Sequence, residues 1–331
     1  MKGIDALDKA VLQRLKDGGF YSGTKLADDL GVSRATIWKH VRRLESLGLD
    51  VVAWPGKGYR LSTPIEWLDE RLIVESLSPK ALGLLGSISC HDVIDSTNTE
   101  LMRPSASKLP SGSVCLAEYQ RAGRGRLGRQ WLAPFGTNLC FSVLWRFDEP
   151  HQVQGLSLAV GVVLIRVLSS LGLEGVSLKW PNDLLFEGKK LGGILIEMSG
   201  EAHGPSKVVM GVGLNRRLPK KVLKAIDQPA IDLDTAFGER APGRNLLVAK
   251  LLSHLLPLLE GYPQEGLRPY LDEWRAAHAF QGQAATLEVG SRLLYGDIVD
   301  ITEAGLLLFR EAGGEAKAYA SGDVRLRSRP S

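Results

Sequence analysis

The chain changes character after Thr63-Pro64, and this break constrains the fold more than any other feature. Residues 1–62 contain 11 Lys/Arg and 7 Asp/Glu, whereas the remaining 269 residues contain 30 of each. The net charge of +4 therefore belongs to the first fifth of the chain, where we expect a polyanionic partner. A chain of 331 residues has room for two or three domains, and we predict the first boundary at 62/63.

The first segment has the pattern of three helices and a hairpin. Apolar residues recur at helical spacing over 7–15, 26–30 and 37–47, and a Gly-Val-Ser turn at 31–33 separates the second helix from the third. A short hairpin is predicted over 51–61. This order is typical of a winged helix-turn-helix domain.

The third helix of such a domain enters the major groove of DNA. The alternative is a three-helix bundle with a solvated basic face, but the location of the positive charge favours DNA binding. Trp38 beside the apolar stripe suits either a DNA contact or packing against the wing. The side chains predicted to contact DNA are Ser22, Arg34, Thr36, Trp38, Lys39, Arg42 and Lys57.

A glycine- and arginine-rich loop follows a predicted strand in the middle of the chain. Residues 120–131 contain four arginines and three glycines, and no Asp or Glu appears again until Asp148. Glycines allow close backbone approach, and arginines supply donors for phosphate or carboxylate. The loop alone suits a small-anion cradle, a solvated basic loop or a nucleic-acid contact about equally.

The segment after residue 63 predicts an α+β domain. Helices are expected near 67–77, 99–102 and 153–171, and strands near 87–93, 114–119, 138–145, 191–197 and 207–213. Strands joined by hairpins predict a mixed, largely antiparallel sheet. No Walker loop, Rossmann fingerprint, GxSxG elbow or HExxH motif is present. Chemistry from Arg, Lys, Asn and Asp instead suits carboxylate activation by a nucleotide.

Two smaller patterns leave alternatives open. Ser96-Thr97-Asn98 at the end of a strand offers hydroxyls and an amide to a neutral polar head, or serves as an ordinary helix cap. The glycines of Gly211-Val212-Gly213 indicate either close approach by a ligand or another part of the chain, or a β-bulge.

Cysteine usage and hydropathy point to the cytoplasm. Cys90, Cys115 and Cys140 are widely spaced and form no CxxC pair, so we expect free thiols and no zinc site. No secretory signal is predicted, and the longest uncharged apolar run, roughly 152–165, is too short to span a bilayer.

Five motifs in order identify the chain as resembling the biotin protein ligases. They are Asp95–Asn98, the GRGRxGRxW core within 118–131, KWPND at 179–183, KKLGGIL at 189–195 and GVGLN at 211–215. The resemblance extends over residues 1 to about 326. With its winged helix, the chain resembles the bifunctional bacterial branch of the family, in which a ligase is also the biotin-operon repressor.

The resemblance implies a two-step reaction. Biotin and Mg-ATP give biotinyl-5′-AMP and pyrophosphate, and a lysine of a biotin carboxyl carrier protein of acetyl-CoA carboxylase then displaces AMP. ATP and Mg²⁺ are the implied cofactors, with no metal ligand assigned to the protein. Operator DNA, bound by a homodimer loaded with biotinyl-AMP, is the second implied partner, and no membrane is involved.

The resemblance also assigns roles to residues of this sequence. The implied biotin contacts are Ser96, Thr97, Asn98, Gln120, Arg124, Gly125, Arg126 and Lys190. The implied nucleotide contacts are Arg126, Arg129, Trp131, Lys179, Asn182 and Asn215. The implied catalytic groups are Arg124, Arg126, Lys190 and Asp183, with Asp183 orienting or deprotonating the incoming lysine.

The sequence departs from the family pattern at two places. Leu127 replaces an arginine often found in the loop. The segment 216–233 lacks the aromatic residue expected to cover the adenylate. Apolar side chains would then form the adenine lid, with Leu218, Val222, Ile226 and Ile231 as candidates.

We predict three domains, residues 1–62, 63–278 and 279–331. A helix over 270–278 precedes short alternating strands over 284–327, which the family pattern makes an SH3-like β-barrel. Two other functions remain open: a non-enzymatic biotin-sensing repressor, and a lipoate or octanoate ligase on the same fold. The presence of Lys190 and Asp183 argues against the first, and the absence of an RRxSGGG-type loop argues against the second.

Overall fold

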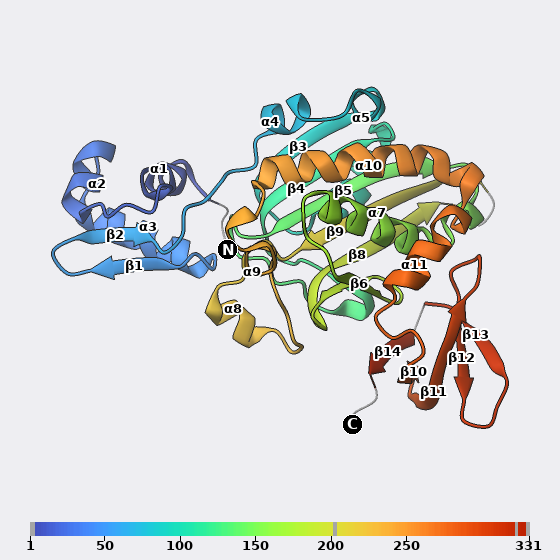
Figure 1. The fold of residues 1–331 in the computed structure, drawn as a ribbon. Helices are drawn as coiled ribbons and strands as arrows, with labels where there is room; N and C mark the ends of the chain where they lie inside the picture. The colour runs from blue at the N-terminus through green and yellow to red at the C-terminus, as the bar shows by residue number, and fades with distance from the viewer. Residues whose placement is uncertain (1–3, 201–203, 322–323, 329–331) are drawn as a thin grey trace.

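The computed structural model describes residues 4–200, 204–321 and 324–328. An N-terminal head, a central α+β body and a C-terminal sheet follow one another along the chain (Figure 1). The extreme ends of the first and last predicted domains, residues 1–3 and 329–331, lie outside the described residues.

The head has the predicted elements in the predicted order. They are α1 (Ala6–Leu15), α2 (Gly23–Leu30), α3 (Arg34–Ser46), β1 (Val51–Trp54) and β2 (Gly58–Leu61). Ser22 and Ser33 cap α2 and α3 by accepting backbone N–H bonds, and Gly31 ends α2 in the left-handed conformation. The apolar stripes of the three helices form one core, so the predicted winged helix-turn-helix is confirmed.

The body is built on a seven-stranded sheet of order β3-β4-β5-β9-β8-β7-β6. The strands are β3 (Ser87–Ile94), β4 (Ser113–Gln120), β5 (Leu139–Phe147), β6 (Val176–Lys179), β7 (Asp183–Phe186), β8 (Lys189–Gly200) and β9 (Ser206–Leu214). Only β3 and β4 pair in parallel, and the other five pairings are antiparallel. The sheet is therefore mixed and largely antiparallel, as predicted.

Helices cover the sheet unevenly (Figure 1). They are α4 (Glu70–Glu75), α5 (Pro79–Leu84), α6 (Thr97–Met102), α7 (Leu156–Ser170), α8 (Lys220–Ala225), α9 (Leu233–Phe237), α10 (Arg244–Glu265) and α11 (Leu271–Ala277). The long helices α7 and α10 pack with the sheet into the main apolar core. Residues 150–170 have the length and mean hydropathy (1.7) of a membrane span, but most of α7 is buried against this core, so we assign it as a core helix.

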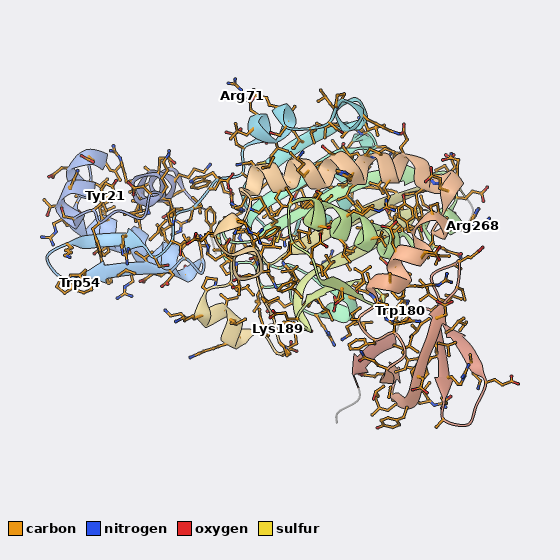
Figure 2. The ribbon with its side chains drawn as sticks, viewed as in Figure 1. Tyr21, Trp54, Arg71, Trp180, Lys189 and Arg268 are labelled. Carbon is orange, nitrogen blue, oxygen red and sulfur yellow. The ribbon has the colours of Figure 1, made fainter. Side chains whose placement is uncertain are left out.

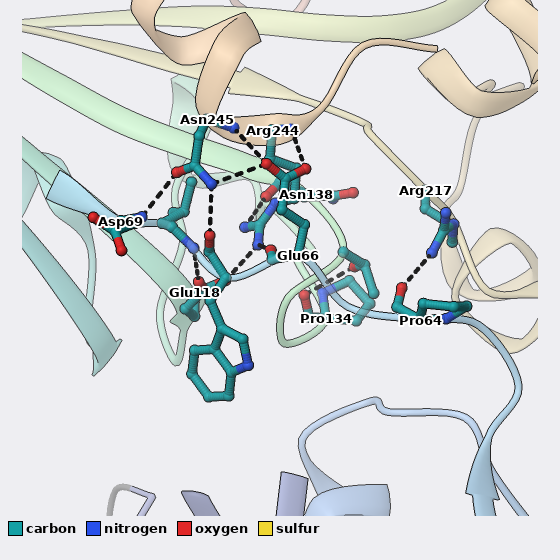
Figure 3. Close-up of polar contacts among 12 residues, drawn as sticks. Pro64, Glu66, Asp69, Glu118, Pro134, Asn138, Arg217, Arg244 and Asn245 are labelled. Carbon is teal, nitrogen blue, oxygen red and sulfur yellow. Dashed lines mark hydrogen bonds and ion pairs between the residues drawn. The ribbon is translucent and has the colours of Figure 1, made fainter. Parts of the chain in front are cut away.

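A buried polar network fastens the connector, residues 62–69, to the body (Figure 3). The carboxylate of Glu66 accepts the backbone N–H groups of Arg244 and Asn245 at the start of α10. Arg244 in turn forms a 2.7 Å ion pair with Glu118 of β4, and both side chains are 4 % exposed. Because a buried charge without its partner is costly, this network holds the connector in one path.

The C-terminal strands form a second, separate sheet of order β13-β12-β11-β10-β14. They are β10 (Ala284–Val289), β11 (Arg292–Ile301), β12 (Leu307–Glu311), β13 (Ala316–Tyr319) and β14 (Val324–Ser328). All pairings are antiparallel. Over the described residues β13 and β14 are the two edges, so the antiparallel sheet is confirmed and its closure into an SH3-like barrel stays a prediction.

Some elements differ from the sequence-based expectation. The helix expected over 67–77 is shorter, because Asp69 caps its start at Glu70. The 22-residue α10 was not predicted at all, since it contains Pro257 and Pro263. Its apolar face packs in the main core, and this tertiary packing outweighs the unfavourable effect of proline on a helix.

Candidate ligand site

One face of the seven-stranded sheet carries a cavity of about 790 Å³. Its volume lies within the range of small-molecule sites. Its lining includes every residue predicted from the family resemblance for biotin, nucleotide or catalysis. They are Ser96, Thr97, Asn98, Gln120, Arg124, Gly125, Arg126, Arg129, Trp131, Lys179, Asn182, Asp183, Lys190 and Asn215.

Small residues in register across three strands create the hollow. Gly213 of β9 pairs with Cys140 of β5 on one side and Gly193 of β8 on the other. In the neighbouring row, Gly211 pairs with Ser142. Since alternate residues of a strand share a face, these positions leave room above the sheet while the residues between them point into the core.

The two glycines of β9 are required by close side-chain approach. A Cβ on Gly211 would lie 2.1 Å from Oδ1 of Asn98, and one on Gly213 would lie 2.7 Å from the ring of Trp131. β9 pairs with both neighbours without a register shift. The alternative of a β-bulge at this motif is therefore wrong.

The floor of the cavity is a connected set of polar side chains. Gln120 Oε1 accepts from the backbone N–H of Thr97 at 2.8 Å. Ser142 Oγ lies 2.6 Å from both Thr97 Oγ1 and Asn98 Oδ1. Ser96, the N-cap of α6, makes no side-chain capping bond and lines the cavity. The Ser-Thr-Asn segment thus presents its polar groups to the cavity in addition to starting a helix.

The Gly/Arg loop forms the roof at one end. Trp131 N–H donates to Gly123 O at 2.8 Å, and Gly125 N–H donates to Arg129 O at 2.7 Å, so the loop turns back on itself. Leu127 at the tip has φ 55° and is 40 % exposed. A left-handed conformation is unfavourable for leucine, and its side chain shares the lining with Arg124 and Arg126.

A lysine and an aspartate meet at the centre of the lining. Lys190 Nζ lies 2.7 Å from Asp183 Oδ1, and both side chains are largely buried. The same Nζ lies 5.8 Å from the ring centroid of Trp131. The arrangement holds one positive charge between an aspartate and an aromatic face, where a carboxylate or phosphate could reach it.

Two predicted nucleotide contacts brace the backbone. Asn215 donates its amide to the carbonyls of Lys190 and Ile231, both at 3.1 Å. Asn182 donates its amide to Ile194 O at 2.6 Å. Each side chain thus fixes strands that line the cavity.

Several lining residues were not found from the sequence. Phe280 lines the cavity from the C-terminal side, and Lys179 Nζ lies 5.8 Å from its ring centroid. Of the four apolar lid candidates, Ile226 lines the cavity, Leu218 and Ile231 are buried outside the lining, and Val222 is half-buried outside it. Alternation of small and large residues could have identified Cys140, but no sequence signal pointed to Phe280.

The cysteines are free, as predicted. Burial raises the pKa of the Cys140 thiol to about 12. A thiol with such a pKa is protonated at neutral pH and is a poor nucleophile. The cavity therefore offers positioning and charge, without a thiolate for covalent catalysis.

The predicted DNA-contacting residues lie on α3 and in the hairpin of the head, except for Ser22, which caps the start of α2. Trp38 is 54 % exposed and stacks with Arg42, whose Cζ is 5.6 Å from the ring centroid. It is not packed against the wing. Trp54 lies at the outer end of the hairpin (Figure 2), with Lys57 Nζ 5.4 Å from its ring centroid. The exposed surface is basic and aromatic.

Comparisons with known proteins agree with this geometry. Residues 90–215 match the biotin/lipoate A/B protein ligase family, and residues 8–60 match a helix-turn-helix domain. The bifunctional ligase/repressor BirA of Salmonella typhimurium is 40% identical over 319 residues, covering 96% of this chain and 97% of that protein. The Bacillus subtilis protein of the same name is 30% identical, covering 97% of this chain and 98% of its own.

A solved structure has a similar fold. Biotin protein ligase from Aquifex aeolicus in complex with biotin and ATP superposes with a TM-score of 0.62 at 26% identity. The match covers 73% of this chain and 99% of that one. A helix-turn-helix head on an α+β body with this cavity defines a ligase of the biotin/lipoate class. Within that class, the chain belongs to the family of bifunctional biotin protein ligase/repressors.

Proposed function

We propose that the protein activates biotin with ATP and transfers it to a lysine of a biotin carboxyl carrier protein. The observation that carries this proposal is the convergence of all the residues predicted from the family on one cavity. In the first step a biotin carboxylate oxygen attacks the α-phosphorus, and the bond to pyrophosphate breaks. In the second step the lysine amine attacks the acyl carbon, and AMP leaves.

The cavity floor suits the ureido ring of biotin. A ureido group has two N–H donors and one carbonyl acceptor, and it therefore needs both acceptors and donors around it. Asn98 supplies an amide oxygen, and the amide nitrogen of Gln120 and the hydroxyl of Ser96 can donate, since Gln120 Oε1 already accepts from Thr97. This set favours biotin over lipoate, which has a dithiolane ring, and over octanoate, which has an alkyl chain.

The positive groups would act on the developing charge. We assign Lys190 to the biotin carboxylate and reaction centre, and Arg124 and Arg126 to closing the loop over the ligand and phosphates. Such groups stabilise a transition state best when they are held in place beforehand, and the 2.7 Å ion pair with Asp183 holds Lys190.

Asp183 is the candidate to orient the incoming lysine amine. Free lysine has a pKa of about 10.4 and is protonated at neutral pH, so a nearby base is needed. Asp183 Oδ1 binds Lys190, and its second oxygen is the one that we assign to the carrier lysine.

Phe280 is our candidate for the aromatic neighbour of adenine. It lines the cavity together with Lys179 and Ile226, and Lys179 Nζ lies 5.8 Å from its ring centroid. Trp131 lies instead over Gly213, with its ring close to the sheet. We assign Trp131 and Arg129 to the nucleotide site, where they would support the roof formed by the Gly/Arg loop.

Mg²⁺ would enter with ATP. Magnesium is usually held by one or two carboxylates together with substrate phosphates and water. The carboxylates in the described lining are Asp183 and Asp227, and Asp183 is already paired with Lys190. The residues therefore fit an ion bound mainly by the nucleotide, where it would neutralise phosphate charge.

The same chain would repress transcription as a dimer. β7 pairs with β8 only up to Gly193 and Asn182 binds Ile194, so in the described structure the segment 196–200 has a free edge beside the cavity. An exposed edge can pair with another strand, and we assign this edge to a second copy or to the carrier domain. We assign residues 1–62 to DNA binding, 63–278 to catalysis and 279–331 to the C-terminal domain, in a cytoplasmic protein.

Biotin-dependent release of pyrophosphate from Mg-ATP tests the ligase. We expect release that needs biotin and turns over many times only when a carrier domain is added. Biotin binding without release would instead support a sensor-repressor. Sedimentation with and without biotin plus ATP tests the dimer, and retention of genomic DNA fragments under the same two conditions tests repression.

A further inference from the structure

The carboxylate of Glu197 joins the floor of the cavity to its roof. Glu197 pairs with Val209 of β9, lies beyond the part of β8 that pairs with β7, and has a side chain that is 26 % exposed. Its Oε2 accepts a hydrogen bond from Asn98 Nδ2 at 2.8 Å. Arg124 Nη2 lies 3.0 Å from Oε1 and 3.1 Å from Oε2. One acidic group thus binds a residue of the floor and a residue of the loop.

On the floor, Glu197 fixes the orientation of the Asn98 amide. Both hydrogens of Nδ2 are used, one by Glu197 and one by the carbonyl of Leu195 at 3.2 Å. Oδ1 lies 2.6 Å from the hydroxyl of Ser142 and directly above Gly211. Asn98 therefore offers a ligand an oxygen only. If the amide were flipped, Nδ2 would face the Ser142 hydroxyl and would lose its hydrogen bond to the Glu197 carboxylate.

In the roof, Glu197 sets the resting position of the Gly/Arg loop. Arg124 donates from Nη2 to both Glu197 and Thr99, the latter at 3.0 Å. These contacts draw the guanidinium toward β8 and α6. An anionic ligand that recruits Arg124 must therefore compete with a carboxylate that already holds it.

We propose that Glu197 is a positioning residue that sets the amide of Asn98 for biotin and holds Arg124 until a ligand anion arrives. The inference rests on the proposed ligase function and adds a residue that the family motifs did not assign. Its charge matters more than its shape, because charge-assisted hydrogen bonds are about twice as strong as neutral ones. Because Asn98 belongs to the floor that we assign to biotin, we expect biotin binding to depend on Glu197 more strongly than ATP binding does.

The first test compares the dissociation constant of biotin, measured by calorimetry without ATP, among four proteins. We expect weakening on the order of tenfold for Glu197→Ala, which corresponds to about 1.4 kcal/mol, and a smaller loss for Glu197→Gln, which keeps an acceptor for Asn98. The KM for ATP should stay within about twofold. Glu260→Gln, which changes an ion pair with Lys80 on the far side of the body, is the matched control.

The second test measures how easily trypsin cleaves the Gly/Arg loop. Trypsin cleaves after arginine, and the loop contains Arg121, Arg124, Arg126 and Arg129. We expect ligand-free Glu197→Ala to be cut in the loop several times faster than the wild type. Arg124→Ala should be cut at the remaining three sites as fast as the double variant, because each change breaks the same contact.

Either of two results would overturn the proposal. One is a Glu197→Ala protein with unchanged biotin affinity and unchanged cleavage. The other is an equal loss of biotin and ATP affinity together with a lowered Tm, as a purely structural residue would give. A wild type without biotin-dependent pyrophosphate release would refute the ligase function, and biotin affinity and loop cleavage would still decide the role of Glu197.

Discussion

The two faces of the seven-stranded sheet differ in one respect, the size of alternate side chains. Along β9, Met210, Val212 and Leu214 point into the core, and Gly211 and Gly213 point to the cavity. Five consecutive residues therefore build a packed face and a hollow one. The comparison teaches that a binding cavity can be made by omitting side chains at every second position, while the other face of the same strand stays packed in the core.

Lys190→Ala is expected to have the largest effect. Removal of a held positive group at the reaction centre should lower the rate of biotin-dependent pyrophosphate release by about 10²–10³-fold. The Tm should stay close to that of the wild type, because the side chain belongs to the hollow face. Lys189→Ala, one residue away and exposed, is the control. A fully active Lys190→Ala protein would show that the assignment of this residue is wrong.

Gly211→Ala tests the cavity face of β9. The added methyl group would lie 2.1 Å from Asn98 Oδ1, so the amide must shift and biotin affinity should fall by about tenfold or more. The KM for ATP should change little. Gly83→Ala, where a Cβ meets nothing within 4 Å, provides the control, and normal biotin affinity in Gly211→Ala would contradict the close approach of Asn98 to the strand.

Met210→Ala tests the packed face of the same strand. Met210 is fully buried, and truncation of such a side chain costs about 2–5 kcal/mol of unfolding free energy. Urea unfolding should show this loss. The KM values for biotin and ATP should remain near the wild-type values, and a selective rise in the KM for biotin would mean that the two faces are not independent.

The smallest effect concerns His278, at the junction with the C-terminal sheet. Burial lowers the pKa of His278 to about 4, below the unfolded value of about 6.5. Between these values the unfolded chain binds a proton that the folded chain does not, so stability should fall as the pH decreases. The expected loss is about 1 kcal/mol at pH 5.5. Unfolding of His278→Phe across this range should lack that slope.

The fold was predictable where local pattern decides it. The head follows from helical spacing, capping serines and one turn, all within 62 residues. The strands of the body follow from alternation. In contrast, α10 was not predicted, because its prolines disfavour a helix. Its burial against the sheet stabilises it.

The site was predictable to the extent that its residues lie in contiguous motifs. The five motifs gave the predicted lining, but Phe280 reaches the cavity because residue 278 forms a parallel bridge with Leu178, 100 positions earlier. Glu197 follows the KKLGGIL motif by two residues, and its partners lie on α6 and in the loop. No single stretch of sequence encodes such long-range pairing.

Phe135 has a consequence for anyone who wishes to use the ligase without its head. This residue of the body is fully buried in the apolar core of the head, and its N–H donates to Leu47 O at 3.0 Å. Four residues earlier the chain forms the cavity wall at Trp131. A protein truncated at residue 62 would expose this aromatic ring to water, so a usable minimal enzyme calls for a polar replacement at position 135 as well as a new start site.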